Sequence, residues 1–348
     1  MKHTASTPAR TAITHVTGSA SVVEPALQTA VLIYNPLAGR RPARRERQIQ
    51  RAAQLLRERG YDLEVLQTSG PGSATELAAR SAARGIDLTI VCGGDGTINE
   101  AVNGLAGAST PLAILPGGTA NIFAREIGLP LDPVRAARAL PRWKPRRIAL
   151  GLASGDHWFG EAPARRQRYF LSVCGVGFDS YVVLKLSSRF KLAAGVAAYA
   201  VEALRQALRY GFPGFECRAA EGTVRATFAV VQRTRRYAGW LHLSPQAHID
   251  QPQLHLCAFK SSNRFRYFLY ALAVLLRKDL SDMARLTTQN VACDPVGGEE
   301  PIYFELDGEL AGMLPARFSL APEALTVLAP QPNDSEKSSA QDTNDQVV

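Results

Sequence analysis

Two short stretches of the sequence place acidic side chains beside glycines. Residues 88–107, LTIVCGGDGTINEAVNGLAG, hold Asp95 where a strand-forming run gives way to a helical pattern, and residues 305–309, ELDGE, hold Asp307 and Glu309 on either side of a glycine. A carboxylate can accept the proton of a hydroxyl group or bind a Mg²⁺ ion that accompanies a phosphate. These three residues are therefore candidate catalytic residues, although ELDGE taken alone also fits an exposed hairpin turn with an Asp-Gly corner.

The GGDG sequence at 93–96 predicts a phosphate site. Its glycines lack a Cβ atom, which allows the backbone to approach a ligand closely. Thr97 and Glu100 fit a T-x-x-E capping box, which predicts that a helix begins at Thr97. The free N–H groups and the dipole at a helix N-terminus attract anions, so the stretch is typical of a phosphate cradle. The alternative is a glycine-rich turn that only joins a strand to a helix.

Two further loops repeat this design, namely NPLAGRR at 35–41 and LPGGTANIFAREIGLP at 115–130. Each includes or follows an apolar run that suits a buried strand, and each precedes a helical pattern. Repeated strand–helix units predict a parallel sheet covered by helices, and the loops of such a sheet meet at its carboxyl edge, where ligands bind. Three glycine-containing loops at one edge favour a binding site over three unrelated turns.

The pattern along the chain predicts four segments. Residues 1–28 are rich in Thr, Ser and Ala, and residues 331–348 are polar, so both are predicted to be disordered tails. Residues 29–145 carry the strand–helix units. Residues 146–330 alternate at period two in several runs, which predicts a β-rich domain.

The composition narrows the class of protein. The chain has 348 residues, of which 46% are hydrophobic and 20% charged, as in an ordinary globular protein. The net charge of +9 favours an anionic partner, but charge alone does not choose between a nucleotide, a nucleic acid and an acidic membrane. The five cysteines are scattered and form no CxxC pair, which argues against a disulfide framework or a zinc site and favours a reducing cytosol.

Five collinear motifs resemble the diacylglycerol kinase catalytic-domain family, which includes bacterial diacylglycerol kinases, YegS-like lipid kinases, and sphingosine and ceramide kinases. The motifs are NP…G from Asn35, GGDGTINEAVNGL, PGGTANIFARE, GVGFDS at 175–180 and ELDGE at 305–309. The resemblance covers about residues 30–330 and implies an ATP-dependent kinase that phosphorylates a lipid hydroxyl, with Mg²⁺ accompanying ATP. It implies a two-domain fold with an N-terminal Rossmann-like parallel sheet with helices and a C-terminal β-sandwich-like lipid domain.

The resemblance also implies roles for individual residues. The expected ATP site is formed by Asn35, Pro36, Leu37, Ala38, Gly39, Thr68, Gly93, Gly94, Asp95, Gly96, Thr97, Ile98, Asn99, Glu100, Gly118, Thr119 and Asn121. Glu309 is the expected acceptor of the lipid hydroxyl proton, and Asp307 and Asp95 are expected to contribute to catalysis beside it. Sphingosine kinases resemble a variant in which the Asp of the glycine loop is the base, so Asp95 remains the alternative.

Two positions depart from the family pattern. Ile122 stands where the family commonly has an Asp, so a helper carboxylate is missing there. The family segment P-x-A-x-x-D-D-G-x-L, which contributes to a structural Mg²⁺ site, is represented here by PQAHIDQPQL at 245–254. Mg²⁺ prefers anionic oxygens, and Gln-Pro replaces Asp-Gly, so the site is predicted to be degenerate. Its remaining candidate ligands are His248, Asp250, Gln251 and Gln253.

Two predicted helices in the second half of the chain indicate what the protein contacts. The apolar run at 268–276 has nine residues, against the ~20 needed to span a bilayer, and its basic flanks predict peripheral contact with an anionic membrane. The helix predicted at 189–210 is interpreted as a packing helix. We expect a cytoplasmic, peripherally membrane-associated protein that binds a lipid with a free hydroxyl and no nucleic acid, with a homodimer as a possible assembly. The alternatives are an NAD-kinase-like nucleotide kinase and a catalytically degenerate lipid-binding regulatory protein.

Overall fold

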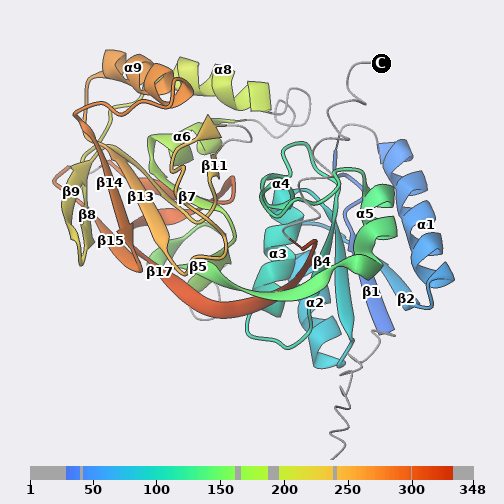
Figure 1. Cartoon of the computed structure of the whole chain (residues 1–348). Coiled ribbons are helices and arrows are strands. Elements are labelled where there is room, and N and C mark those ends of the chain that lie inside the picture. Colours follow the sequence, from blue (N-terminus) through green and yellow to red (C-terminus); the bar gives the residue numbers. More distant parts are fainter. Residues whose placement is uncertain are drawn as a thin grey trace, which may run out of the picture.

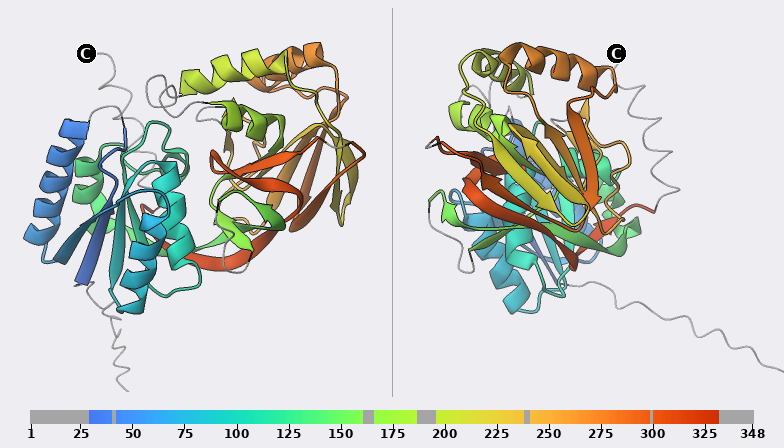
Figure 2. Two further views of the ribbon diagram at one scale, coloured as in Figure 1. Left: turned by 180° about the vertical axis from the view of Figure 1, so that it is seen from behind. Right: turned by 90° about the vertical axis from the view of Figure 1, so that its left-hand side faces the viewer.

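The computed structural model describes residues 29–39, 42–160, 166–186, 196–237, 241–298 and 300–331. The chain forms two lobes, one built of alternating strands and helices and the other mainly of strands (Figures 1 and 2). This arrangement confirms the predicted two-domain α/β plus β fold. Among the described helices, none combines the length and the apolar character that crossing a bilayer requires.

The first lobe is a parallel sheet in the order β2-β1-β3-β4. Its strands are β1 (Thr29–Tyr34), β2 (Asp62–Gln67), β3 (Leu88–Gly93) and β4 (Leu112–Pro116). Every residue of β3 and β4 is buried, as expected of short apolar runs that are covered on both faces. The sheet therefore brings the loops after β1, β3 and β4 to one edge, as the sequence predicts.

Five helices cover this sheet: α1 (Pro42–Glu58), α2 (Ser73–Ala83), α3 (Asp95–Leu105), α4 (Ile122–Glu126) and α5 (Pro133–Ala139). Figure 1 shows α1 and α5 on one side of the sheet and α2 and α3 on the other. Helix α1 buries Ile49, Ala52, Ala53 and Leu56, which recur at helical spacing. The apolar face predicted for this helix is thus its packing face.

The second lobe consists of two sheet layers that share the long strand β17 (Glu309–Ala329). One layer continues from β17 through β16 (Tyr303–Leu306), β7 (Val173–Gly177), β10 (Phe228–Gln232), β13 (Leu254–Phe259) and β14 (Met283–Thr288). The other contains β5 (Lys144–Trp158), β6 (Gln167–Phe170), β15 (Asn290–Pro295), β8 (Phe215–Ala219) and β9 (Gly222–Ala226). Phe170, Phe215, Phe304 and Phe318 are buried in one core of this lobe, as in a sandwich.

The remaining elements border the cleft or the outer surface. They are the 3₁₀ turn η1 (Leu140–Arg142), the strand pair β11 (Arg236–Tyr237) and β12 (Leu241–His242), and the helices α6 (Phe178–Lys185), α8 (Val196–Ala207) and α9 (Arg264–Leu275). Helices α8 and α9 lie beside each other on the outside of the second lobe (Figures 1 and 2). Helix α9 includes all but the last residue of the apolar run at 268–276, which confirms the helix predicted there.

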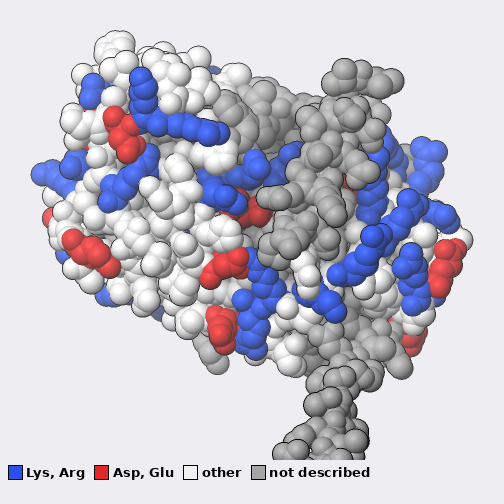
Figure 3. Space-filling view, in the orientation of Figure 1, with Lys and Arg blue, Asp and Glu red and all other residues white. Residues whose placement is uncertain are grey.

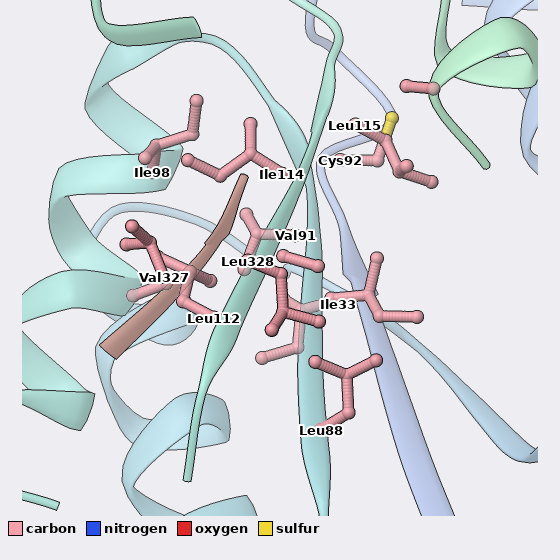
Figure 4. Packing of buried hydrophobic residues seen from close by; sticks show 14 of the residues in the cluster. Ile33, Leu88, Val91, Cys92, Ile98, Leu112, Ile114, Leu115, Val327 and Leu328 are labelled. Carbon is pink, nitrogen blue, oxygen red and sulfur yellow. The ribbon is translucent and has the colours of Figure 1, made fainter. Parts of the chain in front are cut away.

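The end of β17 returns to the first lobe. Val327 pairs in parallel with Leu112 of β4, and β5 runs antiparallel to β17 along most of its length. Val327 and Leu328 pack among Ile114, Val91 and other residues of the first core (Figure 4). The two lobes are therefore tied together by two paired strands rather than by a single linker.

Candidate active site

A cleft of about 520 Å³ lies between the two lobes. The first lobe contributes the loops after β1, β3 and β4, and the second contributes α6, α8, β11 and the turn between β16 and β17. Most of the predicted site residues line it: Asn35, Leu37, Ala38, Gly39, Gly94, Asp95, Gly96, Thr97, Gly118, Thr119, Asp307 and Glu309. Of the predicted catalytic and ATP-site residues, those outside its lining are Pro36, Thr68, Gly93, Ile98, Asn99, Glu100 and Asn121.

The glycine loops after β3 and β4 touch each other. A Cβ atom on Gly118 would collide with the backbone of Gly94, and the N–H of Gly117 donates to the carbonyl of Gly93 over 2.8 Å. Asn121 adopts a left-handed conformation with φ of 49°, and its side chain both accepts from Gly118 N over 2.9 Å and donates to Gly118 O over 3.0 Å. Glycines are required here because two backbones meet, and Asn121 fixes the shape of the second loop.

The predicted capping box does not form. Helix α3 begins at Asp95 with Gly94 as its N-cap, two residues before the predicted start. The Thr97 hydroxyl accepts instead from Asn35 Nδ2 over 3.1 Å, and the Glu100 carboxylate accepts from the N–H groups of Gly72 and Ala74, so that it caps α2. The prediction was wrong because donors from other elements satisfy both side chains. The helix N-terminus nevertheless faces the cleft, as expected of an anion site.

Asp95 stands at this N-terminus, at the floor of the cleft. Its Oδ1 accepts from the backbone N–H of Ile122 over 2.7 Å, so the residue that replaces the family's Asp orients Asp95 through its main chain. Burial raises the pKa of Asp95 to about 6, and hydrogen bonds from the start of α4 oppose that rise. Asp95 therefore changes charge close to neutral pH.

Asp307 is held by donors on both oxygens. Its carboxylate accepts from the three consecutive N–H groups of Leu171–Val173 over 2.7 to 3.0 Å and from Asn99 Nδ2 over 2.6 Å. Its backbone φ of 50° and that of Gly308, 87°, close a tight turn. Asn99 belongs to α3, so Asp307 ties the first lobe to the second and fixes the turn that carries Glu309. Burial raises the pKa of Asp307, and these bonds oppose the rise.

Glu309 reaches across the cleft from the second lobe. Arg168 Nη2 pairs with Glu309 Oε2 over 2.9 Å, and the other carboxylate oxygen faces Gly96, because a Cβ atom at Gly96 would collide with Glu309 Oε1. The absence of a side chain at Gly96 thus admits the carboxylate of one lobe to the phosphate loop of the other. Sequence analysis did not single out Arg168, which stands in a run of basic residues without a motif.

A buried acidic pair was also missed. Asp179 of α6 and Glu305 of β16 form a hydrogen bond with each other, and Tyr237 donates to Asp179. Glu305 accepts from the N–H groups of Gly175 and Gly308 over 2.8 and 2.5 Å. Burial raises the pKa of both carboxyl groups, which is the condition under which two such groups share a proton.

The sequence did carry a signal for this pair. Asp179 lies in GVGFDS and Glu305 is the first residue of ELDGE, so both belong to motifs of the family pattern. Both residues line the cleft beside Tyr237 and Tyr199. The hydroxyl of Tyr199 on α8 donates to Gly308 O over 3.4 Å, so α8 contacts the turn that holds Glu309.

The segment predicted to be a degenerate metal site has its polar groups engaged. Asp250 pairs with Arg146 and, over 3.2 Å, with His248 Nδ1. The carbonyls of Ile249 and Gln251 accept from the guanidinium of Arg233. Within the part of the chain that the structure describes, no three His, Cys, Asp or Glu side chains gather in a way that could hold a metal ion.

Comparison with known proteins places these features in a family. The Diacylglycerol kinase catalytic domain model matches residues 29–153, and the YegS C-terminal NAD kinase beta sandwich-like domain model matches residues 172–329. The chain is 30% identical over 308 residues to a diacylglycerol kinase of Mycobacterium tuberculosis, covering 86% of this chain and 94% of the relative. The chain belongs to the diacylglycerol kinase family. It is also 28% identical over 297 residues to a diacylglycerol kinase of Bacillus subtilis, covering 84% of this chain and 93% of the relative.

Solved structures support the fold of this diacylglycerol kinase family member. A putative diacylglycerol kinase from Bacillus anthracis superposes with a TM-score of 0.73 at 23% identity, covering 90% of this chain and 98% of the other. The resemblance drawn from the five motifs is confirmed by the family models and the curated relatives, whose family makes the protein a kinase. Asp95, Asp307 and Glu309, which line the cleft, stand in the motifs on which that resemblance depended.

Proposed function

We propose that the protein is an ATP-dependent lipid kinase that phosphorylates a hydroxyl of diacylglycerol or of a related lipid. The observation that carries this proposal is the approach of Glu309 to Gly96, which brings a carboxylate of the second lobe to the N-terminus of α3. Phosphoryl transfer requires an acceptor hydroxyl and a phosphate chain to be held in line, with charge stabilisation at the phosphates. A phosphate cradle on one lobe and a proton acceptor on the other meet that requirement.

The nucleotide side of the proposal rests on the three glycine loops. The N–H groups at the start of α3 line the cleft and suit phosphate oxygens, whereas those of Gly117 and Gly118 donate to Gly93 O and Asn121 Oδ1 and so shape the neighbouring loop. ATP supplies the phosphoryl group, and Asp95 is the candidate ligand for the Mg²⁺ that accompanies it, since Mg²⁺ binds through a small number of carboxylates together with phosphates. Asn35 and Thr97 hold the first and second loops together through their side chains.

The choice of Glu309 as the base rests on hydrogen bonding. Asp307 already accepts four hydrogen bonds, two on each oxygen, and is suited to positioning the turn. Asp95 uses one oxygen for Ile122 and lies within the phosphate loop. Arg168 fixes one oxygen of Glu309 and leaves the other directed at the phosphate loop, where a lipid hydroxyl would be deprotonated as it attacks.

The lipid side of the proposal rests on an apolar surface over α8 and α9. The α8–α9 surface consists of side chains that are 37% to 68% exposed: Val201, Leu204, Leu208, Phe265, Phe268, Leu269, Leu272, Leu275 and Leu276. Figure 3 shows a largely uncharged top of this lobe, with basic side chains bordering it. The exposed basic residues of the two helices and their ends include Arg205, Arg209, Arg264, Arg277 and Lys278. An apolar face bordered by cations is typical of a surface that rests on an anionic bilayer.

Helix α8 shows this clearly because apolar side chains lie on its outer face although polar ones are buried beneath it. It buries Glu202 and Gln206, which form a hydrogen bond with each other, and exposes Val201 and Leu204, and Leu208 directly after its end is also exposed. The predicted packing role is confirmed in part: Ala207 is buried, and Tyr199 and Ala203 pack against the apolar core of this lobe, but α8 also presents an apolar face to the outside. A membrane that covers α8 would receive these apolar side chains, and a lipid would then lie beside the helix whose Tyr199 contacts the catalytic turn.

A transfer assay with labelled ATP tests the proposal. The protein is incubated with diacylglycerol, phosphatidylglycerol, a sphingoid base or NAD, and the products are separated by thin-layer chromatography. Label in a lipid product supports the proposal. Label in NADP alone would assign the NAD-kinase-like alternative, and lipid binding without any transfer would assign the degenerate regulatory protein. A homodimer remains a prediction, which sedimentation would test.

A further inference from the structure

Arg233 is a buried cation bound by backbone carbonyls. It directly follows β10 and is 1% exposed. Its guanidinium donates to the carbonyls of Ala149, Ile249 and Gln251, the last two over 2.9 and 3.3 Å. The described residues include no carboxylate that forms an ion pair with it. Burial lowers its pKa to about 10, so the group remains charged at neutral pH.

Two of these carbonyls, those of Ile249 and Gln251, belong to the loop in which the family pattern implies a structural Mg²⁺. Carbonyl and carboxylate oxygens are the ligands that Mg²⁺ and Ca²⁺ prefer. Here two loop carbonyls, of Ile249 and Gln251, accept from a guanidinium, and the loop's carboxylate, Asp250, pairs with Arg146 and His248. A divalent cation does not fit this loop. The loop oxygens already accept hydrogen bonds or form ion pairs, and the permanent positive charge of a guanidinium lies among them.

We propose that the guanidinium of Arg233 replaces the structural metal, so that this loop folds around a cation supplied by the chain itself. A guanidinium can bridge several carbonyls because its N–H groups point outward in one plane. The donor contacts join β5, which runs from the first lobe, to the loop before β13. The loop is thereby held without Mg²⁺ or Ca²⁺.

Arg233 is also connected, through Ser172, to the turn between β16 and β17 that carries Glu309. The backbone N–H of Arg233 donates to Ser172 O over 2.8 Å, and Ser172 N donates to Asp307 Oδ1 over 2.8 Å. The loop at Ile249 is thus joined through Arg233 and Ser172 to the residue that fixes the turn bearing Glu309. Arg233 acts as a positioning residue, and its effect on turnover rests on the proposed function.

The first test uses the wild-type protein without nucleotide or lipid. After dialysis against EDTA, the metal content is measured by elemental analysis, and thermal unfolding is recorded with EDTA, with Mg²⁺ and with Ca²⁺. We expect less than stoichiometric metal and a midpoint temperature that is the same in all three conditions. A metal ion retained at one per chain, or a rise of several degrees with either cation, would overturn the proposal.

The second test removes the guanidinium. Arg233→Met should lower the midpoint temperature by about 10 °C, since three buried carbonyls lose their donors, whereas Arg233→Lys should retain part of the stability. Arg225→Met, which changes an exposed arginine of β9, serves as the control and should have no effect. Equal stability of Arg233→Met and the wild type would overturn the proposal.

Chemical rescue separates a bound cation from general packing. Millimolar guanidinium ion should raise the midpoint of Arg233→Met and, if the proposed function holds, restore part of its turnover at an unchanged ATP affinity. The wild type and Arg225→Met should not respond. If Arg233→Met fails to fold, the rescue is measured on Arg233→Lys, whose ammonium cannot bridge the three carbonyls. Absence of any response of midpoint temperature would count against a cation site. Because the unfolding measurements contain neither ATP nor lipid, their outcome is independent of the proposed function.

Discussion

Glu309→Gln separates catalysis from structure in this kinase. The substitution keeps the size of the side chain and one carbonyl oxygen, but removes the basicity that a proton acceptor needs. Loss of a general base lowers turnover by ~10²-fold or more, which corresponds to about 2.7 kcal/mol of transition-state stabilisation. Glu309 does not contribute to the cradle through its backbone, so the affinity for ATP should change little.

Glu309→Gln should change the stability of the fold much less than it changes turnover. In the pair of Arg168 with Glu309 the side chains are 25% and 38% exposed, so solvent screens the interaction. Such a pair contributes about 1 kcal/mol at most, which corresponds to a shift of about 2–4 °C in the midpoint of unfolding. A loss of turnover with an almost unchanged midpoint would therefore identify a chemical role.

The assay follows labelled phosphate from ATP into the lipid that gives the highest rate, with ATP affinity measured separately by titration. Glu323→Gln removes a highly exposed carboxylate, 78% accessible, from the same strand β17 and serves as the matched control. Asp95→Asn is measured beside it and should weaken both nucleotide binding and turnover. Near-normal turnover of Glu309→Gln, together with an inactive Asp95→Asn that still binds ATP, would show that Asp95 is the base.

Three further outcomes are expected. Gly96→Ala should lower turnover roughly tenfold with an unchanged or slightly raised unfolding midpoint, because the new methyl group displaces Glu309 while alanine favours a helix; normal turnover would contradict the proposed approach of the two lobes. Leu272→Glu on the α8–α9 surface should reduce flotation with anionic vesicles, unlike the exposed control Thr223→Glu, and wild-type binding should weaken with salt. Burial raises the pKa of Asp95 from 3.8 to about 6, so its ionisation destabilises the fold progressively as the pH rises through this range and by a constant amount above it. Denaturant titrations should therefore show Asp95→Asn gaining up to about 3 kcal/mol relative to wild type between about pH 3 and pH 7, and a constant difference would refute the raised pKa.

The sequence by itself determined the features that depend on neighbours along the chain. Short apolar runs such as β3, followed by glycines and a helical pattern, predict a parallel sheet with its binding loops at one edge, because side-chain periodicity and the lack of a Cβ atom act locally. Asp95, Asp307 and Glu309 were found in this way, as members of short motifs. The family followed from the order of those motifs along the chain.

Only the tertiary structure decided which groups these residues contact. Glu100 was expected to cap its own helix, yet it caps α2, because the free N–H groups of Gly72 and Ala74 lie closer to its carboxylate in the folded chain. The outward apolar face of α8 is equally invisible to periodicity, which reports an amphipathic helix but not the side on which the protein lies.

The strongest examples are the charged groups of the second lobe. Asp307 receives donors from Leu171–Val173 and Asn99, more than 130 residues away along the chain, and Asp179 meets Glu305 across a similar separation. Arg233 stands among other basic residues with no motif around it, and its role emerges only when three carbonyls from distant segments surround it. A local pattern specifies which polar groups a segment carries, whereas the cost of burying them is met by partners that only the complete fold brings into contact.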